Sequence, residues 1–581
     1  MNADPVPAEP LAAPLAPEPF AAVLAGPHLV WDNGGVIPSV GLVLGGLLVV
    51  MVARVVATRT GVPASVLLVF AGLAYGFLPG PNLELDPELV LVLVIPPLLY
   101  AAALQSSLIA IRSHARAVVG LSVGLVLGTA LTVGGAFAAI AAVPLSVGIA
   151  LGAAVSPPDP IAALSIGRRA GLPPRLITLI EGEGLLNDAT ALTILQVAVV
   201  AAVEGSFSIP RAIGTFLLVS AGGLAVGAAV AVLVAFLRKR VRDALVDNAL
   251  SLGTPFAAYQ AAEALHLSGV LAVVVAGLWL SHRNPALQTS RARLQSGAVW
   301  RLVEFLLEGY VFLLIGQQLP AVLRGMSSYP LGTVIAAGAA TVGGVLLVRP
   351  VWLLITARLP ARLHARLGGD PDQGNPPLSW RDLTALSWAG TRGVITLAAI
   401  FSLPTTFRDR DLLLFCAYLV VVVTLLVQGL TFAPLARVLH LQSTRVAQAL
   451  VRNQARAAAV DAGLQRLADL RASDPLLAEV IGPLERTAEA RRQRYLERAA
   501  LLSTAEGEVL PVDDQYRAAA RARREMIGAE REELLAWRDA GRLPDADLRI
   551  LESELDHEES VLPVTGREPR PPASGPPSRS N

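Results

Sequence analysis

Long apolar segments separated by short polar loops occupy the chain up to about residue 438. A helix needs about 20 residues to cross about 30 Å of hydrocarbon, and thirteen segments approach or exceed this length. They lie near 38–57, 62–80, 86–104, 117–143, 145–166, 177–203, 211–237, 246–265, 267–281, 299–322, 331–357, 383–403 and 411–438. The segments 246–265 and 267–281 can also be divided differently. The pattern predicts an all-α membrane protein with about thirteen transmembrane helices.

Basic residues gather in the loops that follow the odd-numbered segments. Those loops contain Arg54, Arg59, Arg112, Arg116, Arg168, Arg169, Arg175, Arg238, Lys239, Arg240, Arg242, Arg283, Arg291, Arg293, Arg358, Arg362, Arg366 and Arg381. The alternate loops hold little beyond Arg211, Arg324, Arg408 and Arg410. Because cytoplasmic loops carry an excess of Arg and Lys, the alternation predicts an N-terminus outside the cell and a C-terminus in the cytoplasm.

The composition is that of a membrane protein. Of the 581 residues, 54% are hydrophobic and 16% are charged, whereas soluble domains are about a quarter charged. The net charge of +1 gives no reason to expect a nucleic acid. Cys416 is the single cysteine, so no intrachain disulfide can form. The sequence contains no nucleotide-binding glycine loop, kinase signature or HExxH cluster, so we predict no cofactor and no enzyme activity.

The two ends of the chain differ from its apolar middle. Residues 1–37 are rich in Pro and Ala and contain no Lys or Arg, so they lack the basic region of a secretory signal. We expect 1–37 to be an extracytoplasmic tail and 38–438 to be the transmembrane domain. Residues 439–562 have helical spacing and predict a cytoplasmic helical domain, which is either regulatory or a solvated appendage. Residues 563–581 are rich in Pro, Ser and Arg and predict a disordered tail.

The segment 177–203 carries Glu181, Glu183, Asn187 and Asp188 near its beginning. A charged side chain inside a bilayer costs at least about 2.5 kcal/mol, so such residues usually mark ion or proton pathways. Asp188 lies deepest in the segment and is the best candidate to bind a transported cation. Glu181 lies about 10 Å nearer the cytoplasm, at about 1.5 Å per residue, where it can line an access funnel.

The segment 145–166 is interrupted by Ser156-Pro157-Pro158-Asp159-Pro160. Three prolines cannot continue a helix, because each lacks an N–H and its ring clashes with the preceding turn. Broken backbone is tolerated inside a membrane only where it is buried in protein or lines a water-filled cavity. The plainer interpretation is a proline kink in which Asp159 caps the second half-helix. Capping and ion binding are compatible.

The segment 383–403 contains a second interruption, Gly390-Thr391-Arg392-Gly393. Arg392 can face the negative C-terminal end of a half-helix; the alternative is a chance Gly-Arg-Gly at a helix end. Each interrupted segment is the fifth of a six-segment group, and the two groups cross the membrane in opposite senses. This pattern is typical of an inverted repeat with its ion site between broken helices.

Glu183 needs a partner if it is buried, and Arg349 is the one Arg well inside the apolar segment 331–357. A buried ion pair is more plausible than two isolated charges. The alternative is that Arg349 extends to the cytoplasmic interface. Glu304 and Glu308 form another polar stripe, but they lie towards the end of 299–322 and are as consistent with a solvated rim. We therefore leave these two outside the site.

These motifs resemble the monovalent cation:proton antiporters of the sodium/proton exchanger (NhaP-like) type. The resemblance rests on Pro96-Pro97-Leu98-Leu99-Tyr100, Ser156-Pro157-Pro158-Asp159-Pro160, Glu181-Gly182-Glu183-Gly184-Leu185-Leu186-Asn187-Asp188, Ala262-Glu263, Ser268-Gly269-Val270-Leu271-Ala272, Phe312-Leu313-Leu314-Ile315-Gly316 and Gly390-Thr391-Arg392-Gly393. It covers all thirteen segments. The most specific element is the Asn-Asp motif in register with the Asp of the broken helix.

The resemblance implies an ion-transport domain that moves against a dimer-interface domain, hence a homodimer. It implies that Asp188 carries cation and proton in turn, that Asn187 and Asp159 shape the site, that Glu183 pairs with Arg349, and that Arg392 compensates charge at the crossed helices. With Ser156 and Pro158 these residues form the expected ion site, in which Asp188 and Asp159 ligate the transported cation. The family often has Thr at the position of Pro158 and Ser at that of Gly184. Both departures remove a hydroxyl, which favours coordination by backbone carbonyls or water.

We therefore expect a secondary transporter of the bacterial plasma membrane that exchanges cytoplasmic Na⁺ for external H⁺. The related electrogenic branch has Asp where this chain has Asn187, so exchange is expected to be electroneutral. The alternative is a K⁺(Na⁺)/H⁺ antiporter with a role in pH or volume homeostasis. A cation channel and a membrane sensor are the remaining alternatives; two broken helices that close one site argue against an open pore.

Overall fold

The computed structural model describes most of the chain as helices in two units. It describes residues 36–78, 90–159, 163–164, 172–204, 209–358, 378–404, 406–441, 445–473, 475–503, 514–540 and 542–561. The first unit covers Met1–Leu441 and the second covers Gln442–Asn581. This division lies close to the boundary expected at 438/439. The expected tails, 1–37 and 563–581, lie almost wholly outside the described residues.

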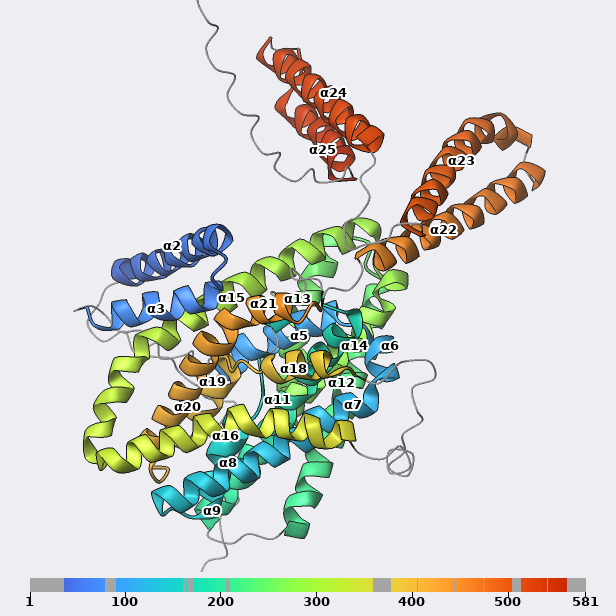
Figure 1. The fold of residues 1–581 in the computed structure, drawn as a ribbon. Coiled ribbons are helices and arrows are strands. Elements are labelled where there is room, and N and C mark those ends of the chain that lie inside the picture. Colours follow the sequence, from blue (N-terminus) through green and yellow to red (C-terminus); the bar gives the residue numbers. More distant parts are fainter. Residues whose placement is uncertain are drawn as a thin grey trace, which may run out of the picture. The chain divides into compact units, whose positions relative to one another are not determined.

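Every described element of the first unit is helical, and each expected apolar segment coincides with one or more helices (Figure 1). The α-helices are α2 (Val36–Thr60), α3 (Ala64–Gly76), α5 (Ile95–Gln105), α6 (Leu108–Ser113), α7 (Ala115–Val119), α8 (Val126–Ala141), α9 (Leu145–Val155), α11 (Pro174–Glu204), α12 (Ile209–Arg238), α13 (Ala244–Glu263), α14 (Gly269–Leu287), α15 (Ser290–Gly325), α16 (Leu331–Arg358), α18 (Trp380–Trp388), α19 (Val394–Phe401), α20 (Arg410–Thr424) and α21 (Leu430–Val438).

Four shorter elements complete this unit. The π-helical segments η1 (Val90–Val94), η2 (Gly120–Leu125) and η4 (Leu425–Gly429) continue directly into α5, α8 and α21, and η3 (Met326–Ser328) is a 3₁₀ turn. π-Helical turns inside α-helices occur frequently at functional sites. One of them, η4, directly follows Thr424, whose contact with Arg392 is described below.

Seven stretches in the described part of the chain are long and apolar enough to cross a membrane by length and composition. They are Val43–Thr60, Ala115–Ala141, Pro174–Val203, Ile213–Arg238, Gly269–Leu287, Leu331–Ala357 and Arg410–Val438. Other helices fall short for identifiable reasons. Helix α3 has 13 residues and α9 has 11, which correspond to only about 20 Å and about 16 Å of helix.

Helix α15 differs from its expected bounds of 299–322. It begins at Ser290, where the hydroxyl of Thr289 accepts a hydrogen bond from the Ala292 N–H at 3.3 Å, the arrangement of a helix N-cap. Its 36 residues correspond to about 54 Å, so the helix is longer than the apolar stretch that predicted it. The division between 246–265 and 267–281 is correct, because α13 ends at Glu263 and α14 begins at Gly269.

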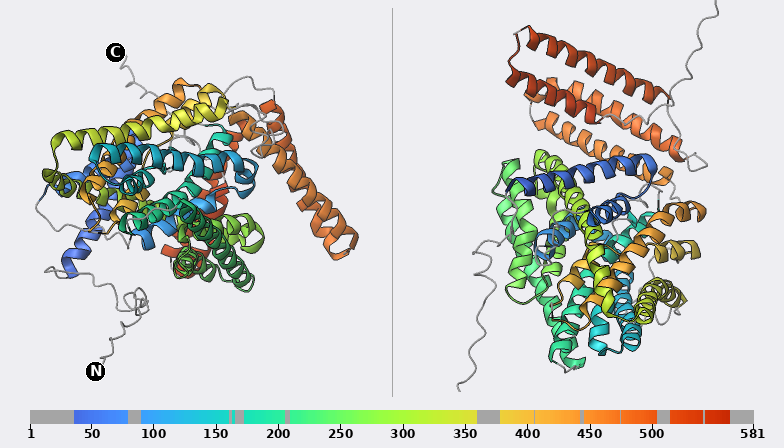
Figure 2. Two further views of the ribbon diagram at one scale, coloured as in Figure 1. Left: turned by 90° about the horizontal axis from the view of Figure 1, so that it is seen from below. Right: turned by 90° about the vertical axis from the view of Figure 1, so that its left-hand side faces the viewer.

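Some helices of this unit pack backbone against backbone at glycine residues. A Cβ on Gly72 of α3 would collide with the backbone of Leu313 in α15, and a Cβ on Gly316 would collide with the backbone of Val69. Such reciprocal approach of two backbones requires glycine at both positions. Helix α16 packs along α8 (Figures 1 and 2), which brings its residue Arg349 towards the centre of the unit.

The second unit contains α22 (Arg445–Ser473), α23 (Pro475–Ser503), α24 (Asp514–Asp539) and α25 (Asp545–Val561). Helices α22 and α23 pack against each other through a small core of Val446, Ala449 and Leu502. Arg471 and Glu485 join the same two helices at 3.0 Å, and Arg531 and Asp556 join α24 to α25 at 2.7 Å. Exposed pairs of this kind contribute little stability.

Candidate ion-binding site

The two interrupted helices meet at the centre of the first unit. Helix α9 ends at Val155, and the non-helical residues 156–159 follow it. Helices α18 and α19 are separated by the non-helical residues 389–393. The Asp159 N–H donates to the Thr391 carbonyl at 2.6 Å, and the Thr391 hydroxyl donates to the Asp159 carbonyl at 3.0 Å. The two breaks therefore satisfy each other's backbone groups, as buried irregular backbone must.

Arg392 lies at the C-terminal end of α9. Its Nε donates to the Val155 carbonyl at 2.9 Å, and its Nη2 donates to the Ser156 carbonyl at 3.2 Å. The side chain also donates to the Gly390 carbonyl, and its backbone N–H donates to the Thr424 hydroxyl at 2.9 Å. The last carbonyls of a helix lack partners and carry partial negative charge. A buried guanidinium satisfies them here, as the sequence analysis expected.

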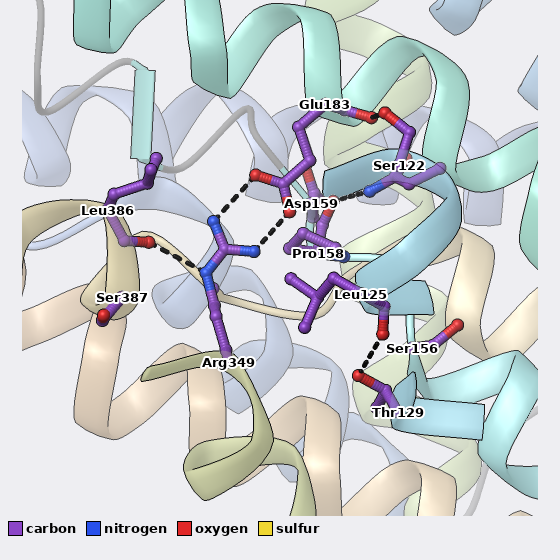
Figure 3. A network of polar contacts seen from close by, with 12 residues as sticks. Ser122, Leu125, Thr129, Ser156, Pro158, Asp159, Glu183, Arg349, Leu386 and Ser387 are labelled. Carbon is purple, nitrogen blue, oxygen red and sulfur yellow. Dashed lines mark hydrogen bonds and ion pairs between the residues drawn. The ribbon is translucent and has the colours of Figure 1, made fainter. Parts of the chain in front are cut away.

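Glu183 and Arg349 form a buried ion pair between α11 and α16 (Figure 3). Arg349 Nη2 lies 2.8 Å from Glu183 Oε2, and Nη1 contacts Oε1. The Nε of Arg349 donates to the Leu386 carbonyl of α18 at 2.8 Å. Arg349 is 2% exposed, so it does not extend to the interface. A planar guanidinium suits this two-point contact, and it ties three helices together.

Asn187 and Ser156 are buried but turn their polar groups towards backbone. Asn187 Nδ2 donates to the Pro158 carbonyl at 3.2 Å, which holds the broken helix against α11. The Ser156 hydroxyl donates to the Ala153 carbonyl at 2.7 Å. Within the described part of the chain, no group donates a hydrogen bond to Asn187 Oδ1. The amide orientation follows from the hydrogen-bond network.

Asp188 differs from these residues because its carboxylate has no hydrogen bond or ion pair to any residue that the structure describes. It is 4% exposed and lines a cavity of about 180 Å³ together with Asp159 and Glu181. Helices α5, α11, α15 and α19 and the break after α9 enclose this cavity. A buried carboxylate without a fixed partner can be neutralised by a cation or by a proton. The cavity gives either one a place to bind.

The structure thus divides the expected site residues into two sets. Asp188, Asp159 and Glu181 line the cavity, whereas Ser156, Pro158, Asn187, Glu183, Arg349 and Arg392 do not. The second set binds the broken helices, α11 and α16 to one another through the hydrogen bonds described above. Gly184 lines the cavity as well, so a side chain at this position would face the cavity.

The sequence analysis placed Glu304 and Glu308 outside the site, but both line the cavity. Gln105 of α5, also unassigned from the sequence, lines it too and donates from Nε2 to Glu304 Oε2 at 3.1 Å. The i,i+4 spacing of the two glutamates was the available signal. It was misinterpreted because the expected segment began nine residues too late, since α15 begins at Ser290 rather than at 299.

A second buried ion pair, Arg238 with Asp247, was also missed. Arg238 Nε lies 3.2 Å from Asp247 Oδ1, and both side chains are almost fully buried. Arg238 Nη1 donates to Asn284 Oδ1 at 2.6 Å, and Gln288 Nε2 donates to Asp247 Oδ2 at 2.7 Å. These contacts join the end of α12 to α13 and to the end of α14. Arg238 had been assigned to a solvated loop because Lys239, Arg240 and Arg242 follow it.

A helical membrane protein whose two broken helices cross beside a buried carboxylate has the architecture of a secondary transporter. The solved structure of the sodium proton antiporter MjNhaP1 from Methanocaldococcus jannaschii has the same fold. It aligns with a TM-score of 0.56 and 16% identity over 70% of this chain and 99% of that one.

Sequence comparison identifies the family. The pattern of the family described as "Sodium/hydrogen exchanger, transmembrane" matches residues 46–438. A Mycobacterium tuberculosis protein described as an uncharacterized Na(+)/H(+) exchanger is 32% identical over 548 residues, which cover 90% of this chain and 97% of that protein. The "Sodium, potassium, lithium and rubidium/H(+) antiporter" of Bacillus subtilis is 30% identical over 388 residues, 63% of this chain and 56% of that protein.

The chain belongs to the sodium/hydrogen exchanger family. It is a multi-pass membrane protein that carries out cation/proton exchange transport, and its relatives are transporters rather than enzymes.

Proposed function

We propose that this protein exchanges Na⁺ for H⁺, and that Asp188 binds the two ions alternately. The observation that carries the proposal is the state of Asp188, a buried carboxylate that lines a cavity and has no hydrogen bond or ion pair among the described residues. One carboxylate cannot hold a proton and a cation together, so each ion displaces the other. Asp159 lines the same cavity and is the second proposed ligand of the cation.

Exchange is proposed to be electroneutral because the polar neighbours of Asp188 on α11 do not change their charge during the transport cycle. Asn187 cannot titrate, and Glu183 is neutralised by Arg349. Arg392 is bound to the carbonyls at the end of α9 and compensates no titrating group directly. One proton therefore replaces one monovalent cation at Asp188. No net charge moves when the site changes its exposure from one side of the membrane to the other.

A second candidate is K⁺(Na⁺)/H⁺ exchange with a role in pH or volume homeostasis. It is supported by the relative from Bacillus subtilis, whose name includes potassium, lithium and rubidium beside sodium. The departure at Gly184 also favours it, because this residue lines the cavity and a cavity without its hydroxyl contains fewer fixed oxygen ligands with which to select an ion by size.

The proposed setting of the protein follows from its charge pattern and family. We place it in the plasma membrane as a homodimer, with residues 1–37 outside, 38–438 in the bilayer, and the helical residues 439–562 and the tail 563–581 in the cytoplasm. The basic loops after the odd-numbered segments support this orientation. The orientation is tested by labelling single cysteines, Phe20→Cys or Arg570→Cys, in a Cys416→Ala background. Only the cysteine at position 20 is expected to react with an impermeant maleimide in intact cells.

The function is tested with purified protein in proteoliposomes that carry an internal pH dye. Addition of Na⁺, Li⁺ or K⁺ to one side is expected to draw protons from the other side towards it, with Na⁺ effective at the lowest concentration. A lower half-saturating concentration for K⁺ would favour the second candidate. Conduction of cations without coupled proton movement would identify a channel instead and overturn the proposal.

A further inference from the structure

Two carboxylates of α15 form part of the wall of the cavity. Glu304 and Glu308 are i,i+4 on this helix, so they share one face, and both line the cavity that contains Asp188. Among the described residues that line it, none is Arg, Lys or His. The cavity therefore holds acidic side chains without a basic one. Clefts lined by one sign of charge raise the local concentration of the opposite ion.

Glu304 is held in place by a neighbouring helix. Gln105 of α5 donates to its Oε2 at 3.1 Å, which leaves the remaining lone pairs of the carboxylate available to a cation. Glu308 lies one turn further along α15, within electrostatic range of both Glu304 and Asp159. Arg54 is the basic residue that acts on Glu308, but its side chain is exposed and does not line the cavity.

The acidic residues of the cavity do not converge on a single point. In the described part of the chain no group of three His, Cys, Asp or Glu side chains lies close enough to hold one metal ion. The cavity carboxylates therefore do not form one three-carboxylate site, although Glu308 lies within electrostatic range of Asp159. The same cavity also contains the carboxylate of Asp188. Asp188 is more than nine-tenths buried and lacks a hydrogen-bond partner among the described residues, so a cation in the cavity can be bound there as well.

We propose that Glu304 and Glu308 form a second cation position on α15, which the monovalent cation occupies before it reaches Asp188. Gln105 positions Glu304 for this role. The inference rests on the proposed function, because it adds a step to binding at Asp188. A cation at the α15 position keeps part of its hydration, since only two carboxylates face it, and it passes to Asp188 across the cavity. Protons reach Asp188 without this position, so the exchange ratio is unaffected.

Such a position acts on cation affinity and not on turnover. The negative charge of α15 is needed while the cation accumulates in the cavity, whereas the rate at saturating cation is set after Asp188 has been loaded. Neutralising either glutamate is therefore expected to raise the apparent KM for Na⁺ and to leave the maximal rate nearly unchanged. A residue that only supports the fold would lower the amount of active protein, and with it the maximal rate, without this change in KM.

The test compares Glu308→Gln, Glu304→Gln and the double variant in proteoliposomes over a wide range of Na⁺ concentrations. The apparent KM of Glu308→Gln is expected to rise about tenfold, which corresponds to about 1.4 kcal/mol of lost cation binding, with a maximal rate within about twofold of the parent. Glu308→Asp should recover most of the affinity. Asp411→Asn removes an exposed carboxylate of α20 outside the cavity and serves as the control.

An unchanged KM in the folded double variant overturns the proposal, and so does a fall in maximal rate alone. Should the double variant fail to fold, Glu304→Gln and Gln105→Ala decide by the same comparison of KM with maximal rate. The proposed function fails independently, through residual exchange in Asp188→Asn protein. The α15 variants retain Asp188, so the two failures are distinguishable.

Discussion

Arg349 of α16 neutralises Glu183 of α11 through a two-point contact. The Nε of the same guanidinium donates to the Leu386 carbonyl of α18. Two residues with exposures of 2% and 1% thereby connect the helix that carries Asp188 to one of the broken helices. The pair neutralises a second carboxylate that lies five residues from Asp188 on the same helix.

Removal of one partner of this pair should destabilise the protein more than removal of both. Glu183→Gln or Arg349→Met leaves an uncompensated buried charge, which typically costs about 3–5 kcal/mol. The double variant should recover part of that loss. Thermal unfolding of the detergent-solubilised proteins measures the effect, and a purely additive double variant would contradict the pairing.

Gly393 should tolerate no side chain. A Cβ at this position would collide with the carboxylate of Asp159, so Gly393→Ala must displace either α19 or Asp159. We expect the rate of exchange to fall at least about tenfold, as 1 Å misplacements at a reacting centre can cost more than this. Gly343→Ala in α16 is the matched control, because a Cβ there meets no atom within 4 Å. Equal activity of the two variants would contradict the crossing geometry.

The pair of Arg238 and Asp247 should stabilise the fold without affecting ion affinity. Asp247→Asn leaves the buried Arg238 uncompensated. The free energy of unfolding should fall by about 3–5 kcal/mol, and the unfolding temperature should fall with it. The apparent KM for Na⁺ should not change, because neither residue lines the cavity. Arg240→Gln, an exposed neighbour, should have little effect. A change in KM with normal stability would assign this pair to the transport pathway.

The order of helices was predictable because lipid imposes long apolar segments. The two breaks were predictable because each concentrates helix-interrupting residues within a few positions, three Pro around Asp159 and two Gly around Arg392. The contact between Arg349 and Glu183 followed from the rarity of Arg inside an apolar segment. The pair of Arg238 and Asp247 could not be found in this way, since Arg238 precedes three basic residues and resembles a loop charge. Its partner depends on how α12 turns into α13, which spacing along the chain does not reveal.

The position of Glu304 and Glu308 in the cavity wall was not predicted, for a different reason. Apolar content defines the part of a helix that touches lipid, but α15 continues for nine residues before that part begins, from Ser290 to 299. The two glutamates therefore lie near its middle rather than towards one end. Likewise, Ser156 and Pro158 were expected at the ion because their segment is broken, yet the structure gives Arg392 and Asn187 as partners of their carbonyls. Which side of a broken segment faces a cavity is decided by packing.

Exchange should be insensitive to membrane potential. With Asn187 unable to titrate and Glu183 paired with Arg349, one proton replaces one cation and no net charge crosses. A potassium-diffusion potential, imposed with valinomycin in K⁺-free or K⁺-loaded proteoliposomes, should leave the rate of Na⁺/H⁺ exchange unchanged. Acceleration by one polarity and inhibition by the other would show that Asp159, Glu181 or a glutamate of α15 carries an additional proton.

The role of Asp188 is tested most directly by Na⁺-driven proton flux of Asp188→Asn protein in proteoliposomes. The substitution preserves size and removes a buried cavity carboxylate that has no hydrogen bond or ion pair among the described residues. The account predicts that flux falls to the level of protein-free liposomes, while the purified variant elutes and unfolds like the parent. Substantial Na⁺-dependent proton flux in such a folded variant would contradict it.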